Sequence, residues 1–185
     1  MWMIFVAVML QAQAPATDEY RGIWRAAVEE ISGSRPGRTL VLFDTTAGAC
    51  GTPAVHPCFT LPDPLVAGRD IPAADILRVR GALEHEPVPI GSLNLAQVRP
   101  MSRSEFRTLT ATASGEDFWT GFYSRYPGSA GWVVLSAPSI DRSSDTAWVF
   151  VDHIYGNLGA EGWLLSLRRR GNGWEVARKW LLWQS

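Results

Sequence analysis

The sequence predicts an α+β fold, in which an N-terminal helix and short helices pack on a curved antiparallel sheet of about four to six strands. Three observations lead to this prediction. Residues 17–32 have helical periodicity, and residues 131–185 form four consecutive strand-like segments joined by short turns. The chain has 185 residues, a length that suits one domain with a hydrophobic core.

The first predicted helix covers Thr17 to Ser32. Thr17 can cap its N-terminus, and Gly33 can end it. The apolar run Thr39–Phe43 follows, and its continuous hydrophobicity predicts a short strand that is buried on both faces. The helix has one apolar stripe at three- and four-residue steps, formed by Tyr20, Ile23, Trp24, Ala27, Val28 and Ile31.

Residues 45–100 are rich in proline, which removes backbone donors and disfavours long regular elements. We expect a short helix from Pro72 to about Leu83, with Ile76, Leu77 and Leu83 facing inward. Alternating apolar residues also indicate a weak strand over Ser92–Arg99.

Two short helices are predicted next. Ser102 and Glu105 have the spacing of a capping box, and Ser114 can cap the second helix, which ends before Pro127. This second helix is strongly aromatic, so we expect it to pack on the sheet that follows. Its large side chains are Phe118, Trp119, Phe122 and Tyr123.

The predicted sheet begins with Trp132–Ala137, where Pro138 indicates an edge strand or a bulge. Thr146–Tyr155, Trp163–Arg169 and Trp174–Trp183 continue it, and Gly171-Asn172-Gly173 is a strong hairpin signal. Strict alternation would place Trp174, Val176, Trp180 and Leu182 on one face of the last strand and Ala177, Leu181 and Trp183 on the other. By analogy, this order of elements suggests a cystatin-like or nuclear-transport-factor-2-like cone.

The N-terminus predicts export. Met1–Leu10 is an uninterrupted apolar run, and an Ala-x-Ala pattern ends at Ala14. We therefore predict a signal peptide over 1–14 and a single α+β domain over 15–185 with its sheet core at 131–185, located in the periplasm or secreted. The run is too short to span a bilayer, so the mature chain should have no transmembrane segment. The alternative is a buried N-terminal strand, because no basic residue precedes the run.

The cysteines, Cys50 and Cys58, are close in sequence, and in an exported chain such a pair predicts a disulfide. His56 lies between them, which raises the alternative of a metal site. Structural zinc uses four ligands at closer spacing, so we predict no metal. A nucleophilic Cys50 is less favoured, because it would oxidise with its neighbour.

The candidate site lies at the end of a central predicted strand, beside the Gly156 turn. His153 and Tyr155 could bind a ligand at the mouth of a curved sheet, or His153 could act as a general base. Asp152 points to the opposite face, so it cannot form a dyad with His153 without a bulge. A structural histidine is favoured over a catalytic one, and no catalytic residue is assigned.

Other polar patterns carry less functional information. Glu84-His85-Glu86 lacks the spacing that places two metal ligands on one helix face and indicates a solvated turn. Arg168-Arg169-Arg170, with Arg178 and Lys179 opposite, could touch an anionic partner, but a solvated hairpin is favoured. No phosphate loop or dinucleotide fingerprint is present, so no cofactor is predicted. A net charge of −1 argues against nucleic-acid binding.

The segment from Phe118 to Ser185 resembles a family of uncharacterised exported bacterial proteins with a tryptophan-rich C-terminal sheet. The resemblance rests on Phe118-Trp119-x-x-Phe122, Tyr126-Pro127-x-Ser129-x-Gly131, Leu135-Ser136, Gly156-x-Leu158, Gly173-Trp174-x-Val176 and Trp183-x-Ser185. Members often have a cysteine pair where this chain has Tyr155 and Gly159, so a thiol or metal role is not implied there. The resemblance implies export but no activity.

The leading hypothesis is a non-catalytic exported protein that binds a small apolar ligand or a protein partner. It predicts an aromatic patch that is exposed or lines a pocket, so full burial of Trp132, Trp163 and Trp183 would count against it. The alternative is a small hydrolase or isomerase with a polar site around His153. That alternative requires His153 to face a cavity with a carboxylate within hydrogen-bond reach.

Overall fold

The computed structural model describes residues 18–49, 58–59, 69–84, 86–112 and 115–185. The predicted signal peptide, Cys50 of the predicted Cys50–Cys58 disulfide and His85 therefore fall outside the described residues. The helices are α1 (Asp18–Gly33), α3 (Ala73–Leu83), α4 (Arg103–Thr112) and α5 (Glu116–Arg125). The strands are β1 (Thr39–Phe43), β2 (Gly48–Ala49), β3 (Cys58–Phe59), β4 (Val98–Met101), β5 (Ser129–Leu135), β6 (Ser139–Asp141), β7 (Thr146–Ile154), β8 (Ala160–Arg170) and β9 (Gly173–Gln184).

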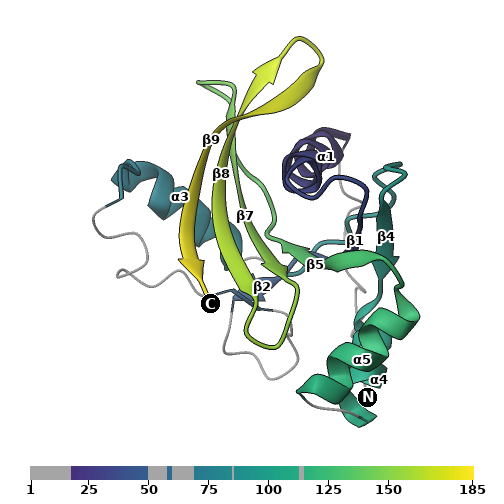
Figure 1. Cartoon of the computed structure of the whole chain (residues 1–185). Coiled ribbons are helices and arrows are strands. Elements are labelled where there is room, and N and C mark those ends of the chain that lie inside the picture. The colour runs from purple at the N-terminus through teal and green to yellow at the C-terminus, as the bar shows by residue number, and fades with distance from the viewer. Residues whose placement is uncertain (1–17, 50–57, 60–68, 85, 113–114) are drawn as a thin grey trace, which may run out of the picture.

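These elements confirm the α+β class. The main sheet of the described chain has seven strands in the order β4-β1-β5-β7-β8-β9, with β6 paired to β7. The run β5-β7-β8-β9 is antiparallel, as predicted, and the sheet is strongly twisted along it (Figure 1). β1 lies between β4 and β5 and pairs with both in parallel, which the sequence pattern had not indicated.

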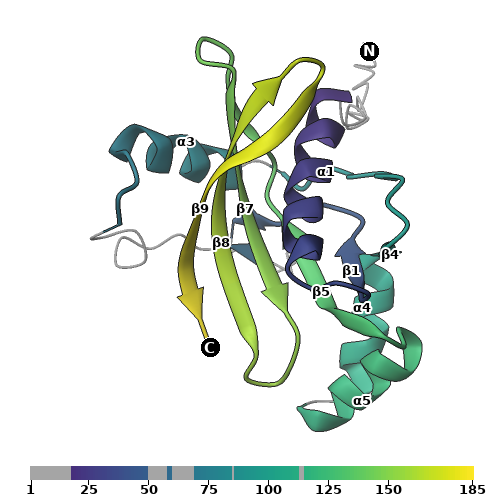
Figure 2. The same ribbon diagram turned by 45° about the horizontal axis from the view of Figure 1, so that its top comes forward.

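Helices cover both faces of the sheet. α1 packs on one face, where Ile23, Trp24 and Val28 contact the buried side chains of β7 and β8. α3, α4 and α5 lie on the other face, as the two views show (Figures 1 and 2). The predicted amphipathic stripe of α1 is confirmed, because Tyr20, Ile23, Trp24, Ala27, Val28 and Ile31 all belong to this packing.

The aromatic helix α5 packs on β5, as expected. Trp119 stacks on Trp132 with ring centroids 4.8 Å apart and planes 7° apart. Phe118 and Phe122 meet Trp132 edge to face at 5.3 Å. Offset stacks and edge-to-face pairs are the favoured geometries for aromatic rings, so this cluster fixes α5 against the sheet.

The last strand does not alternate strictly. Its register with β8 shifts between Ser166 and Leu167 and again between Gly162 and Trp163. As a result Ala177 and Leu182 are bulge positions, and each bulge reverses the facing of the residues beyond it. Trp174 and Val176 pack on the α1 face, whereas Trp180, Leu182 and Trp183 pack on the α3 face. The prediction that Trp174 and Trp180 share a face is therefore wrong.

The proline-rich region also differs from expectation. α3 begins next to Pro72, but Leu77 is 67 % exposed and Val79 is buried in its place. The strand predicted over Ser92–Arg99 is displaced to β4, and residues 91–95 are irregular. Both errors have one cause: apolar residues in an irregular or edge segment need not follow the period of a buried element.

Candidate functional site

His153 lies in the interior of the protein. Its side chain is 0 % exposed, and Nε2 donates to the carbonyl oxygen of Ala130 at 2.7 Å. Nδ1 lies 3.3 Å from Oε1 of Glu161, the residue that faces His153 across the β7–β8 pair. Burial lowers the pKa of the His153 imidazole; the two hydrogen bonds oppose this shift, and the charge of Arg35 adds to it.

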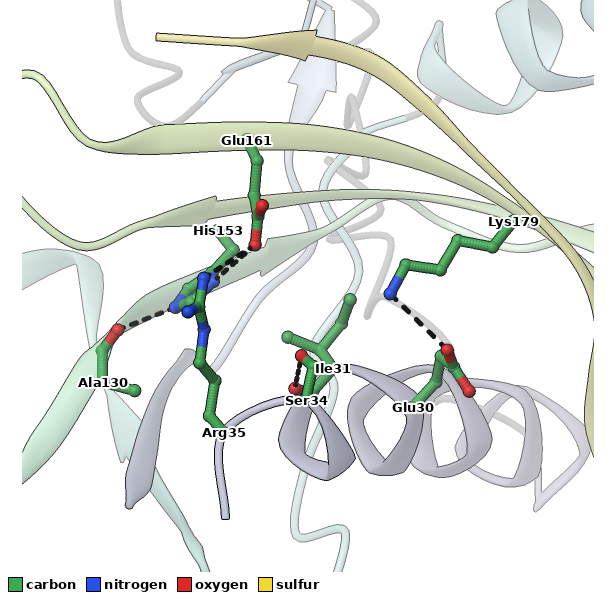
Figure 3. Close-up of polar contacts among 8 residues, drawn as sticks. All are labelled: Glu30, Ile31, Ser34, Arg35, Ala130, His153, Glu161 and Lys179. Atoms are coloured by element: carbon green, nitrogen blue, oxygen red, sulfur yellow. Dashed lines mark hydrogen bonds and ion pairs between the residues drawn. The ribbon is translucent and has the colours of Figure 1, made fainter. Parts of the chain in front are cut away.

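Arg35 and Tyr155 complete this cluster, which we call the His153 cluster; Figure 3 shows its members Arg35, His153 and Glu161. Arg35, just beyond the end of α1, pairs with Glu161 at 3.2 Å, and its guanidinium lies 5.0 Å from the centre of the Tyr155 ring. The rings of His153 and Tyr155 are 5.0 Å apart. The structure therefore places the two predicted binding residues, His153 and Tyr155, side by side, but the His153 side chain has no contact with solvent.

Asp152 points to the opposite face, so it forms no dyad with His153. Gly162 lies across the β7–β8 pair from Asp152, and a Cβ there would be 1.8 Å from Nε1 of Trp183. The Trp183 indole occupies this space and bonds the Asp152 carboxyl, while Oδ1 of Asp152 is buried without a partner. Burial raises the pKa of Asp152 to about 8.

A shallow groove lies next to the predicted site, between α5 and the Gly156 turn. We call it the α5 groove. Tyr123 donates its hydroxyl hydrogen to the Tyr155 carbonyl oxygen at 2.8 Å and so joins the two segments. The α5 groove has a volume of about 620 Å³ and is lined by Glu116, Trp119, Thr120, Tyr123, Ser124, Gly156 and Asn157.

The three tryptophans whose full burial would count against the binding hypothesis differ in exposure. Trp132 is buried under Trp119, whereas Trp163 and Trp183 are half-buried.

A larger cavity lies at the other edge of the sheet, and the sequence had not indicated it. We call it the β4 cavity. It lies between the C-terminal end of β1, strand β4 and the loop that enters β4. Its volume is about 700 Å³, and it is lined by Leu42, Phe43, Asp44, Pro89, Gly91, Ser92, Leu93, Asn94, Leu95, Ala96, Val98 and Pro100.

The loop over this cavity has an unusual backbone. Gly91 and Asn94 both have positive φ, 70° and 53°, values that glycine and asparagine tolerate best. Ser92 donates its hydroxyl hydrogen to Oδ1 of Asn94 at 2.8 Å, and Arg25 of α1 bonds the Leu93 carbonyl at 2.9 Å. These contacts fix the backbone of the loop that lines the cavity.

Among the described residues that line the β4 cavity, one is titratable, Asp44. Burial raises the pKa of Asp44, and the nearby Arg103 guanidinium opposes the shift. Arg103 is itself held by Thr45 at 2.9 Å and by the Thr46 carbonyl at 3.0 Å. Asp44 is thus a carboxyl group placed in a mainly apolar cavity beside a fixed positive charge.

Strand β4 is an edge strand that offers little to an added strand. The Val98 N–H already bonds the Leu95 carbonyl at 3.1 Å, and Pro100 has no N–H. A peptide that extends a sheet needs donors and acceptors along the edge. This edge therefore favours a small molecule over an extended peptide as the occupant of the β4 cavity.

Among the described residues, no group of three or more His, Cys, Asp or Glu side chains could hold a metal ion. None of the described helices has the length and apolar character needed to cross a membrane. Comparisons with protein-family models, curated proteins and solved structures gave no match to this chain.

Proposed function

We propose that this protein is an exported, periplasmic or secreted binding module that takes a small, mainly apolar ligand in the β4 cavity. The single observation that carries the proposal is the cavity itself. Its volume of about 700 Å³ lies within the usual range for ligand sites, and most of its lining is apolar. Export through the N-terminal signal peptide and a Cys50–Cys58 disulfide belong to the same proposal.

The polar groups of the cavity narrow the ligand class. Asp44 is an acceptor, because its carboxylate can take a hydrogen bond from a ligand hydroxyl or amine. Ser92 and Asn94 bond each other, so Asp44 is the acceptor best placed to orient a ligand. We therefore expect an apolar body that has one hydrogen-bond donor.

The alternative is a hydrolase or isomerase acting at His153, and its support is weaker. A general base must reach the proton that it removes, directly or through one water. His153 is 0 % exposed, and its Nε2 is bonded to the Ala130 carbonyl. A carboxylate does lie nearby, but the geometry favours a structural role for this histidine. Ligand binding at Tyr155 stays a prediction.

A neutral fluorescent probe tests the binding proposal. N-phenyl-1-naphthylamine has an apolar body and one N–H donor, which matches the expected ligand class. We expect saturable fluorescence enhancement with the native sequence. Leu95→Arg should weaken it by about tenfold or more, because the substitution places a charge in an apolar cavity.

The matched control is Leu158→Arg, because Leu158 is 82 % exposed and lies outside the β4 cavity. This control should bind the probe like the native protein, and Asp44→Asn should bind a few-fold more weakly. Thermal unfolding would verify that each variant is folded. Equal binding by the native protein and Leu95→Arg would reject the β4 cavity as the site. If the probe binds in the β4 cavity, mass spectrometry of material that co-purifies from the envelope fraction would identify the natural ligand.

A further inference from the structure

A second, smaller cavity lies at the opposite edge of the sheet, and we call it the hairpin cavity. It lies between the first turn of α3 and the paired strands β7, β8 and β9, and its volume is about 200 Å³. This size suits a small ion or group. The lining residues are Asp75, Thr146, Trp148, Ser166, Arg168, Ala177, Arg178 and Trp180.

The strand register explains why these residues meet. Trp148 and Arg178 both pair with Ser166, and Arg168 pairs with Thr146, so these side chains share one face of the sheet. Arg178 reaches this face because Ala177 is a bulge position. Under strict alternation Arg178 would lie on the α1 face with Val176.

Two arginines of the cavity lack ionic partners. In the described part of the chain, no ion pair or side-chain hydrogen bond is formed by Arg168 or Arg178. The neighbouring basic residues differ: Arg169 pairs with Glu19, Arg170 with Glu175, and Lys179 with Glu30 at 3.5 Å. The basic hairpin is therefore neutralised except at the cavity.

A buried donor of the same cavity is also unsatisfied. Trp148 is 4 % exposed, and its indole N–H is buried without a hydrogen-bond partner. Two other indole groups are satisfied: Trp24 donates to the Ser136 carbonyl at 3.0 Å, and Trp180 to the Asp70 carbonyl at 3.2 Å. The indole N–H of Trp163 is also unpaired, but Trp163 does not line this cavity. An unmade hydrogen bond at a buried donor is costly, so the Trp148 indole is expected to have a partner in the working protein.

The surroundings favour an anion as that partner. Among the described lining residues, two guanidinium groups outweigh one carboxylate, Asp75, which gives this part of the lining a net positive formal charge. The first turn of α3 also contributes, because the N-terminal end of a helix is electropositive. Arg78 lies over the Trp148 ring at 5.6 Å, but its charge is paired with Asp141 at 2.9 Å, so the free positive charge of the cavity comes from Arg168 and Arg178.

We propose that the hairpin cavity binds a small oxyanion, a carboxylate or a phosphate group, between Arg168 and Arg178. The planar guanidinium groups match the geometry of both oxyanions. The indole N–H of Trp148 and the hydroxyl of Ser166 supply further donors. This site is separate from the β4 cavity and does not depend on the ligand bound there.

Titration with defined anions tests the proposal. The full-length mature protein, with its indole nitrogens labelled with ¹⁵N, would be titrated with inorganic phosphate and with acetate at constant ionic strength set by chloride. We expect saturable binding in the millimolar range and a shift of the Trp148 indole resonance, assigned with Trp148→Phe. The anion with the lower dissociation constant identifies which oxyanion the cavity prefers.

Variants localise the site. Arg168→Gln and Arg178→Gln should each weaken binding by about tenfold, because each loses a charge-assisted hydrogen bond. Arg168→Lys should bind with intermediate affinity, because it keeps the charge and loses the planar fork. The matched control is Arg107→Gln, which removes an exposed charge from α4 and should change the affinity less than about twofold. Circular dichroism would show that each variant is folded.

Three outcomes would overturn the proposal. One is the absence of saturable binding of either anion. Another is an equal loss of affinity in Arg107→Gln and Arg168→Gln, which would indicate a general charge effect. The third is binding of heparin without binding of phosphate or acetate, which would indicate an extended polyanion surface instead of a cavity.

Discussion

Two polar groups on strand β7 are almost completely buried, and they lie on opposite faces near opposite ends of the strand. His153 is 0 % exposed and Trp148 is 4 % exposed. His153 bonds the Ala130 carbonyl and lies beside Glu161, whereas the indole N–H of Trp148 has no partner. The sequence pattern indicated His153 as a candidate binding residue and favoured a structural role over a catalytic one; of these two groups, the one without a hydrogen-bond partner is the Trp148 indole.

The difference teaches how to separate structural polar groups from binding groups. Burial is the same at both positions, so it does not distinguish them. Hydrogen bonding distinguishes the two positions, because a native fold pairs nearly all of its buried donors. A buried donor without a partner therefore needs an explanation. The His153 cluster joins β5, β7, β8 and the end of α1, which is a structural task (Figure 3). The hairpin cavity brings the unpaired indole N–H of Trp148 together with two exposed arginines that have no ionic partner among the described residues, and this combination favours anion binding.

The largest expected effect is at His153. His153→Ala should lower the free energy of unfolding by about 3–4 kcal/mol, because it leaves a cavity and an unpaired Ala130 carbonyl. Urea denaturation measures this effect. His153→Gln should recover part of the loss, since its amide can donate to the same carbonyl. An unchanged unfolding free energy for His153→Ala would contradict a structural role.

The neighbouring Asp152 should make stability fall with rising pH. Its pKa is about 8 in the folded protein, above the ordinary 3.8, so the folded state holds a proton that the unfolded state has lost. Stability from this group is therefore complete below about pH 4 and is lost as the pH rises to about 8. Asp152→Asn should remove this decline and stabilise the protein on the order of 3 kcal/mol above that range.

His153 should act in the opposite direction, which sharpens the contrast between the two neighbours. Burial lowers its pKa, so the unfolded state binds a proton that the folded state resists, and stability falls as the pH drops below about 6.5. Denaturation curves measured across the pH range would separate the two contributions. If Asp152→Asn kept the alkaline decline of the native protein, the decline would arise from another group.

The smallest expected effect is a difference in unfolding free energy between substitutions of two buried tryptophans, Trp24 and Trp148. Trp24→Phe removes the hydrogen bond to the Ser136 carbonyl, whereas Trp148→Phe removes an N–H that has no partner. In a buffer free of phosphate and carboxylates, Trp24→Phe should cost about 1 kcal/mol more unfolding free energy than Trp148→Phe. Chemical denaturation measures both. Added oxyanion should stabilise the native protein more than Trp148→Phe, which keeps Arg168 and Arg178 but loses one donor; equal stabilisation of both would contradict the contrast.

Much of the fold could be predicted because its signals are local. The stripe of α1, the capping box before α4 and the turn at Gly171-Asn172-Gly173 each depend on a few adjacent residues. The capping bond is present, with the Glu105 N–H donating to the Ser102 hydroxyl at 3.1 Å. The antiparallel run from β5 to β9 follows, because neighbouring strands with short turns pair in order.

The candidate sites were predicted less well because they depend on pairing between distant segments. The β4 cavity needs β1 to lie in parallel between β4 and β5, and residues 39–43 alone do not specify those partners. The hairpin cavity needs the bulge at Ala177, which a strict period of two conceals. His153 and Tyr155 were correctly placed together, but their burial depends on Arg35 and Glu161 from other elements.

The sequence by itself determined the α+β class, the helix α1 and the order of the antiparallel strands, since periodicity and turn residues act over short distances. Tertiary structure decided which buried polar groups have a hydrogen-bond partner within the protein and which remain available to a ligand. A hydrogen bond from His153 to Ala130 or a missing partner at Trp148 depends on where a distant backbone passes, and bulges and strand partners set that path.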